Sequence, residues 1–135
     1  MTESINVGYR SLADNVLRPY LVLDVTGPNG ITRRIIGIVD SGADRSCFPK
    51  GFITEFGYDP TGLTAQVMTQ AGGTTTSYVA TANCSAVVVD LENTTFSLAP
   101  TFVDGSYVLW GRTDFMNTFD ITLLQSQNRF TVSTH

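Results

Sequence analysis

The chain has 135 residues, of which 42% are hydrophobic and 15% are charged, and its formal net charge is -4. This size and composition predict one soluble globular domain, residues 1–135, with a hydrophobic core, and they exclude a disordered chain. Because binding of nucleic acid requires a face rich in lysine and arginine, the acidic balance argues against nucleic acid as the main partner.

The N-terminal part of the sequence carries weak patterning. Residues 1–5 lack the basic and apolar regions of a signal peptide, and no apolar run approaches the roughly 20 residues that span a bilayer. We therefore expect a cytoplasmic protein with no membrane partner. Residues 1–17 are expected to form an N-terminal arm rather than part of the core.

The first predicted pair of strands leads to an acidic residue. Residues 20–25 and 31–39 are rich in apolar and β-branched side chains, and they flank residues 27–30, which have the composition of a hairpin turn. Asp40 is therefore expected to lie just beyond the end of a strand.

A second hairpin is predicted in the middle of the chain. Residues 64–69 and 75–80 have strand composition, and the segment between them contains Gly72 and Gly73. A glycine-rich tip of this kind can move, because glycine restricts the backbone least.

The rest of the chain continues the strand pattern, with one short helix. Strands are predicted at 82–90, 95–98, 101–103 and 108–110, and a terminal β-hairpin at 120–135. The helix is expected to begin near Thr113, whose hydroxyl is a suitable cap, and to turn Phe115, Met116 and Phe119 inward. The sequence thus predicts an all-β fold with one short C-terminal helix.

Two residue types restrict the available chemistry. Cys47 and Cys84 are too few for a disulfide framework and lack ligands at zinc-site spacing, so both are interpreted as buried apolar residues. The one histidine is His135, the last residue, which excludes histidine-activated nucleophiles and multi-histidine metal sites. Carboxylates, hydroxyls, backbone groups or a bound cofactor remain as sources of chemistry, and among these we expect a site that needs no metal and no cofactor.

Asp40 is the strongest candidate for a catalytic group. Ser41 follows it with a hydroxyl, and Gly42 then permits a tight turn with close backbone approach. Such a loop can hold a carboxylate rigidly. Taken alone, however, the Asp-Ser-Gly triplet is also the composition of an ordinary turn.

The flanking residues carry a family resemblance. The segment Ile38-Val39-Asp40-Ser41-Gly42-Ala43-Asp44 resembles the catalytic loop of retropepsin-like aspartic proteases, the retroviral proteases and their cellular and bacterial relatives. The resemblance implies an acid-protease β-barrel with one lobe per chain. It also implies catalytic roles for Asp40, Ser41 and Gly42, and substrate contacts from Ala43, Asp44, Ala71, Gly72 and Gly73, the last three in a mobile flap. A plain hairpin turn is the alternative explanation of that tip.

A second segment, residues 108–114, resembles the apolar-apolar-Gly-Arg segment that opens the family's C-terminal helix. The resemblance implies an ion pair between Arg112 and Asp44, and it implies a pairing of Arg18 with the catalytic loop of another subunit. Loss of the Arg112 pair would cost roughly 3–5 kcal/mol if the pair is buried, and under about 1 kcal/mol if it is solvated.

Three features depart from the family pattern. Trp110 is bulkier than the usual aliphatic residue before the glycine, and Arg45 stands where retroviral enzymes often carry an acid. The chain also continues well past the helix, whereas retroviral subunits interleave their termini there. The third departure leaves the mode of dimerisation open.

One motif per chain supplies one carboxylate, but the family's reaction uses two that share a proton across a water molecule. The expected enzyme is therefore a homodimeric aspartic endopeptidase with an Asp40 from each subunit, acting on peptide or protein substrates on the acidic side of neutral. The alternatives are a dimeric peptide-binding module that does not cut, and a monomeric β domain with an accidental Asp-Ser-Gly turn.

Overall fold

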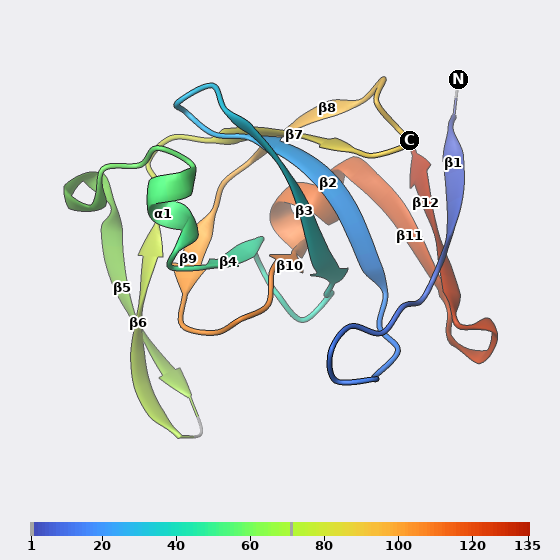
Figure 1. Cartoon of the computed structure of the whole chain (residues 1–135), viewed down its shortest axis with the longest axis horizontal. Helices are drawn as coiled ribbons and strands as arrows, with labels where there is room; N and C mark the ends of the chain where they lie inside the picture. Colours follow the sequence, from blue (N-terminus) through green and yellow to red (C-terminus); the bar gives the residue numbers. More distant parts are fainter. Residues whose placement is uncertain (1, 71) are drawn as a thin grey trace.

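A computed structural model describes residues 2–70 and 72–135, and these residues form a mainly β structure with short helical segments (Figure 1). The strands are β1 (Ser4–Gly8), β2 (Tyr20–Thr26), β3 (Thr32–Val39), β4 (Cys47–Pro49), β5 (Thr64–Gln70), β6 (Gly73–Val79), β7 (Cys84–Val88), β8 (Thr95–Leu98), β9 (Thr101–Val103), β10 (Leu109–Trp110), β11 (Phe119–Leu124) and β12 (Arg129–Thr134). The helical segments are α1 (Phe52–Glu55), the 3-10 turns η1 (Pro60–Gly62) and η3 (Gln125–Gln127), and the π-helical turn η2 (Arg112–Met116).

The strands form two sheets. The larger sheet has the order β5-β6-β9-β4-β10-β3-β2-β7-β8, and the smaller has the order β1-β12-β11. The β5–β6 hairpin projects at one end of the molecule, and the smaller sheet lies at the other end, where both termini are found (Figure 1). No helix in the described part of the chain is long and apolar enough to cross a bilayer.

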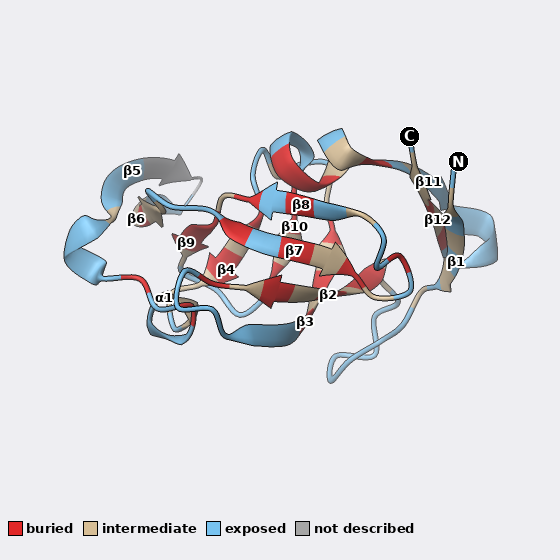
Figure 2. Cartoon of the chain, turned by 90° about the horizontal axis from the view of Figure 1, so that it is seen from above, coloured by how far each residue is buried: buried red, intermediate tan, exposed pale blue. Residues whose placement is uncertain are grey.

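Buried residues are concentrated along the strands of the larger sheet (Figure 2), and they form a hydrophobic core. Phe48 in β4 is fully buried, and its ring centroid lies 5.1 Å from that of Phe56 and 5.8 Å from that of Trp110. Both pairs are edge-to-face, the geometry that aromatic quadrupoles favour. This aromatic core holds β4 and β10 in place, and these strands flank the loop that follows β3.

The bulk of Trp110 is accommodated by a glycine on the neighbouring strand. β10 lies beside β3, and a Cβ built at Gly37 of β3 would lie 2.7 Å from Cε2 of the Trp110 indole. The indole Nε1 donates a hydrogen bond to the Leu21 carbonyl oxygen over 3.0 Å, so the buried ring is both packed and satisfied. The tryptophan at this position is therefore compatible with the sheet because residue 37 lacks a side chain.

Gly37→Ala is expected to lower the free energy of unfolding by roughly 1–3 kcal/mol, because the added methyl group overpacks a site closed by Trp110. The measurement is the urea midpoint at constant m-value. Gly8→Ala is the matched control, since a Cβ at Gly8 of β1 meets no atom within 4 Å. Equal midpoints for the two variants would contradict this account of the packing.

The all-β fold class with a short C-terminal helical segment is confirmed. All three predicted hairpins are present, as β2–β3, β5–β6 and β11–β12 with antiparallel pairing, and Asp40 directly follows β3. The sequence did not predict β1, β4 or α1. The expected cap was wrong, because the residue at the N-terminus of η2 is Gly111, and the Thr113 hydroxyl instead donates to the Asp44 carbonyl oxygen over 2.7 Å.

The chain after η2 forms the hairpin β11–β12, and β12 pairs on its other edge with β1. Residues 4–8 of the expected N-terminal arm are thus strand residues, whereas residues 10–17 are exposed. The buried Phe130 and Val132 of β12 join the main core. The smaller sheet is therefore assembled from one chain and packs against the larger one.

Candidate active site

Asp40 lies where β3 ends, in the loop that leads to β4. Its backbone N–H donates to the Trp110 carbonyl oxygen over 3.1 Å, and the N–H of Val39 donates to the Pro19 carbonyl oxygen over 3.0 Å. These bonds tie the end of β3 to β10 on one side and to the start of β2 on the other. The position of the half-buried Asp40 side chain is thus set by the sheet.

The Asp-Ser-Gly turn is closed by the aspartate itself. The Asp40 carboxylate oxygen Oδ1 accepts a hydrogen bond from the Gly42 N–H over 2.8 Å, and the Ala43 N–H donates to the Asp40 carbonyl oxygen over 3.2 Å. A Cβ at Gly42 would lie 3.1 Å from the same carboxylate oxygen, so a side chain here would crowd the acid. The Ser41 side chain is exposed.

The far end of the loop is joined to η2. Arg112 Nη2 donates to Asp44 Oδ1 over 2.5 Å, its backbone N–H donates to the Ala43 carbonyl oxygen, and the Thr113 N–H donates to the Asp44 carbonyl oxygen. The side chains of Arg112 and Asp44 are 57% and 79% exposed, however. In this single chain the ion pair is solvated, so its contribution to stability is expected to be under about 1 kcal/mol.

A buried pair that the sequence analysis missed holds the same loop more firmly. Asp114 Oδ1 accepts from the Ser46 hydroxyl over 2.8 Å and from the Phe115 N–H over 2.7 Å, while its Oδ2 accepts from the Ser46 N–H over 3.2 Å. Ser46 is fully buried and Asp114 is 9% exposed. No local pattern marks this pair, because its members are 68 positions apart.

Gly111 completes the junction between the loop and η2. Its N–H donates to the Ser46 hydroxyl over 3.1 Å. A Cβ at this position would overlap the backbone of Arg45, with its carbonyl carbon only 2.4 Å away. The glycine before Arg112 is therefore required because two backbones meet there.

A cleft of about 590 Å³ opens beside the loop. It is lined by Asp40, Gly42, Ala43, Asp44, Arg45, Cys47, Gln66, Ser77, Thr101, Val103, Asp104 and Leu109. Gln66 and Ser77 belong to the β5–β6 hairpin, so the hairpin and the Asp40 loop form walls of one cleft. Burial raises the pKa of the Cys47 thiol, with smaller contributions from Asp114 and Asp40, so this cleft residue is a neutral thiol.

The cleft wall contains two buried hydroxyls. Those of Ser77 and Thr101, which are 1% and 8% exposed, find no hydrogen-bond partner among residues 2–70 and 72–135. Unpaired hydroxyls are costly in a packed interior, and water or a ligand commonly satisfies them. They favour a polar occupant near this wall.

The structure brings together only part of the expected site. Asp40, Gly42, Ala43 and Asp44 line the cleft, whereas the exposed Gly72 and Gly73 at the hairpin tip are not among its lining residues. Ala71 lies outside the described residues.

Arg18 has a partner within its own chain. Its Nη1 atom forms an ion pair with Asp14 Oδ2 over 2.6 Å, and its guanidinium lies 5.4 Å from the centroid of the Tyr107 ring. The pKa of Asp14 is lowered, first by the hydrogen bond from the Val16 N–H and then by Arg18. Contact between Arg18 and Asp44 of another subunit would have to compete with this pair.

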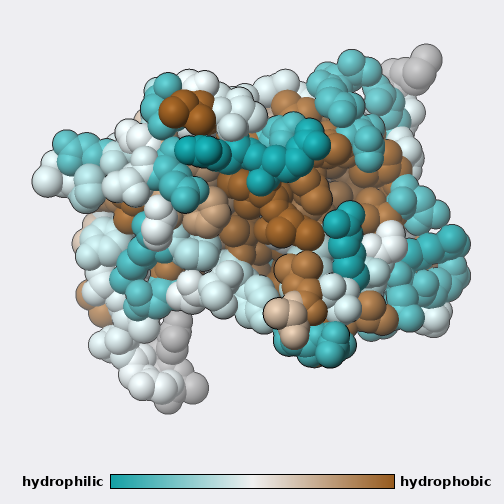
Figure 3. Space-filling view, viewed as in Figure 1, coloured by the Kyte–Doolittle hydropathy of each residue, from teal (hydrophilic) through white to brown (hydrophobic). Residues whose placement is uncertain are grey.

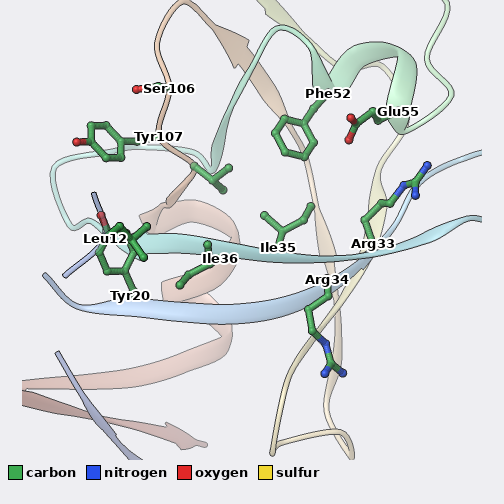
Figure 4. A pocket seen from close by; sticks show the side chains of 11 residues that line it. Leu12, Tyr20, Arg33, Arg34, Ile35, Ile36, Phe52, Glu55, Ser106 and Tyr107 are labelled. Carbon is green, nitrogen blue, oxygen red and sulfur yellow. The ribbon is translucent and has the colours of Figure 1, made fainter. Parts of the chain in front are cut away.

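A second pocket, of about 390 Å³, shares no lining residue with the cleft (Figure 4). It lies over the β3 face between Tyr107 and α1, and Arg33 stands at its edge. Apolar side chains gather across the face of the molecule that Figure 3 displays.

No group of three or more histidine, cysteine, aspartate or glutamate residues in the described ranges could hold a metal ion.

Comparison with known proteins gives a fold-level match. No protein-family model and no curated protein matches the sequence. A solved structure of a retropepsin-like aspartic protease from Rickettsia conorii matches with a TM-score of 0.70 and 16% sequence identity, over 99% of this chain and 92% of that one. The chain therefore has the retropepsin-like fold, with one lobe per chain, as the two sequence motifs predicted.

Proposed function

We propose that the chain is one half of a homodimeric aspartic endopeptidase, with an Asp40 carboxylate from each subunit. The observation that carries the proposal is the position of Asp40: it follows the interior strand β3 of a retropepsin-like fold and lines the cleft that the β5–β6 hairpin also lines. Two sequence-distant segments, the Asp40 loop and η2, are hydrogen-bonded to each other at this cleft.

The chemistry follows from two carboxylates that share one proton. Like charges at about 3 Å cannot both ionise cheaply, so one Asp40 remains protonated. The ionised carboxylate takes a proton from the attacking water, and the protonated one donates to the peptide carbonyl oxygen. Because this arrangement requires one proton on the pair, cleavage is expected to be fastest on the acidic side of neutral.

The dimer is required because each chain supplies one Asp-Ser-Gly loop. A two-fold axis beside Asp40 would bring two such loops together, and the exposed Ser41 hydroxyl is free to contact the loop of the second subunit. Exposed apolar side chains in the segment before β2 also favour a protein contact. They are Leu12, Val16 and Leu17, which are 44%, 47% and 50% exposed.

The β5–β6 hairpin is suited to act as the flap. Gln66 and Ser77 on its two strands line the cleft, and the tip contains Gly72 and Gly73, the latter with a φ of 127°. Closure of such a hairpin over a bound peptide would exclude water and offer backbone hydrogen bonds.

The function is tested by profiling cleavage of a peptide mixture between about pH 3 and pH 7. We expect cleavage that is strongest at acid pH, is blocked by a statine-type transition-state mimic, and follows the dimer fraction measured by sedimentation. Tight peptide binding without turnover would instead assign a non-catalytic peptide-binding module. A monomer at high concentration and at both ends of the pH range would leave the site with one carboxylate and overturn the proposal.

A further inference from the structure

We propose that Arg45 gives the cleft a preference for peptides that carry an acidic side chain close to the scissile bond. This inference rests on the proposed peptidase function and specifies its substrate class. It concerns the charge of the cleft wall rather than the catalytic carboxylates.

The charged residues that line the cleft are Asp40, Asp44, Arg45 and Asp104. Arg112 pairs with Asp44 over 2.5 Å, and Lys50 pairs with Asp104 over 2.9 Å. Arg45 is the one cation among the lining residues, and none of the ion pairs within residues 2–70 and 72–135 includes it. Its charge is therefore available to a ligand.

The backbone of Arg45 is fixed although its side chain is exposed. Gly111 packs directly against its carbonyl group, and the Cys47 thiol donates to its carbonyl oxygen over 3.3 Å. The next residue, Ser46, is fully buried and bound to Asp114. A guanidinium on a rigid backbone loses less freedom on binding than one on a mobile loop, and its planar donors match a carboxylate in two-point contact.

The distance to the scissile bond is limited by the chain. Arg45 follows Asp40 by five positions, so their Cα atoms are at most about 17 Å apart. An extended peptide advances about 3.3 Å per residue, so the acidic side chain should lie within about five residues of the bond that is cut. Successive side chains of an extended peptide point to opposite sides. Near each Arg45, the preference for an acidic side chain should therefore be strong at one peptide position and weak at the two adjacent positions.

The proposed symmetry sharpens the expectation further. The two-fold axis that relates two Asp40 residues also relates two Arg45 residues, one on each side of the scissile bond. The acidic preference should therefore appear at two positions, on the N-terminal and the C-terminal side of the cut, at similar distances from it.

The test uses sets of peptides with one cleavage site, which carry Glu, Gln or Lys at each position within five residues of that site. For the wild-type protein, kcat/KM for the Glu peptide should be roughly five- to tenfold that for the Gln peptide at the preferred positions. This Glu-to-Gln ratio should fall as salt is added. Arg45→Glu should invert the order, so that Lys is preferred over Glu at the same positions. Arg45→Gln should bring the ratio near one.

Arg33→Glu is the matched control, because it makes the same change of charge at an exposed residue of the separate pocket in Figure 4. It should leave the Glu-to-Gln ratio as in the wild type. If Arg33→Glu shifts the ratio as much as Arg45→Glu, the preference comes from overall charge and the inference is wrong. An unchanged ratio in Arg45→Glu also overturns it.

The outcomes separate this inference from the function on which it rests. If the wild type cleaves peptides without an acidic preference, the role of Arg45 is refuted and the proposed peptidase function stands. If no peptide is cleaved, the peptidase function itself is refuted. Sedimentation of Arg45→Glu completes the test, because a variant that dissociates into monomers would assign Arg45 to the subunit contact instead of to substrate.

Discussion

Asp40→Asn should leave a folded dimer that no longer cleaves peptides, with kcat/KM reduced by about a thousandfold or more. The amide is nearly the same size as the carboxyl, and its oxygen can still accept the Gly42 N–H that closes the turn in the wild type. It cannot, however, take a proton from water or share one with its counterpart. The loss should therefore appear in catalysis while the urea midpoint and the sedimentation coefficient remain close to those of the wild type.

Asp120→Asn is the matched control for this variant. Asp120 lies on β11 in the smaller sheet and its side chain is 74% exposed. Within residues 2–70 and 72–135 its one ion-pair partner is His135, whose Nε2 lies 3.8 Å from Asp120 Oδ1. The same chemical change there should leave cleavage intact. Undiminished cleavage by Asp40→Asn would show that peptide hydrolysis takes place at another site or comes from a contaminant.

The sequence was informative where the signal is local. Turn residues between two strand-like runs predicted the β2–β3 hairpin, and an apolar strand followed by Asp-Ser-Gly predicted the position of Asp40. Each of these signals lies within about 20 consecutive residues, and each depends on turn chemistry and alternation that the backbone enforces directly.

The elements that were missed depend on distant partners. β4 has three residues and is a strand because it lies between β9 and β10, which are more than 50 positions later in the chain. β1 alternates polar and apolar residues, but over only five positions, Ser4–Gly8, and its pairing with β12 joins the two ends of the sequence. Short strands of this kind are fixed by their neighbours, so their own composition does not identify them.

Two of the three departures from the family pattern, Trp110 and the chain beyond η2, have physical explanations in the fold. Trp110 fits because Gly37 leaves room for its ring, and the segment after η2 forms a sheet with β1 of the same chain. Within that sheet β12 is paired on one edge with β1 and on the other with β11, so neither edge needs a strand from a second subunit. In the proposed dimer, the contact between subunits would therefore centre on the Asp40 loop and its surroundings rather than on interleaved termini.

The second large effect is expected at Asp114, whose buried contact with Ser46 joins residues 68 positions apart and is marked by no local sequence pattern. Asp114→Ala should lower the free energy of unfolding by roughly 2–4 kcal/mol, because it leaves the N–H and hydroxyl of the fully buried Ser46 and the N–H of Phe115 without their acceptor. The measurement is again the urea midpoint at constant m-value.

Arg112→Ala is the informative comparison, since it removes the solvated partner of Asp44 from the same junction and should cost under about 1 kcal/mol. The order of the two effects distinguishes two accounts of how the Asp40 loop is held. If Asp114→Ala is the more damaging, the loop is anchored by a buried carboxylate that accepts three hydrogen bonds. Breaking a buried ion pair costs roughly 3–5 kcal/mol. If Arg112→Ala lowers the free energy of unfolding by about 3 kcal/mol or more, the Arg112–Asp44 pair must therefore be shielded from water by a group outside the single chain. A second subunit closing over the loop would have that effect, so the loss should then depend on protein concentration, whereas the effect of Asp114→Ala should not.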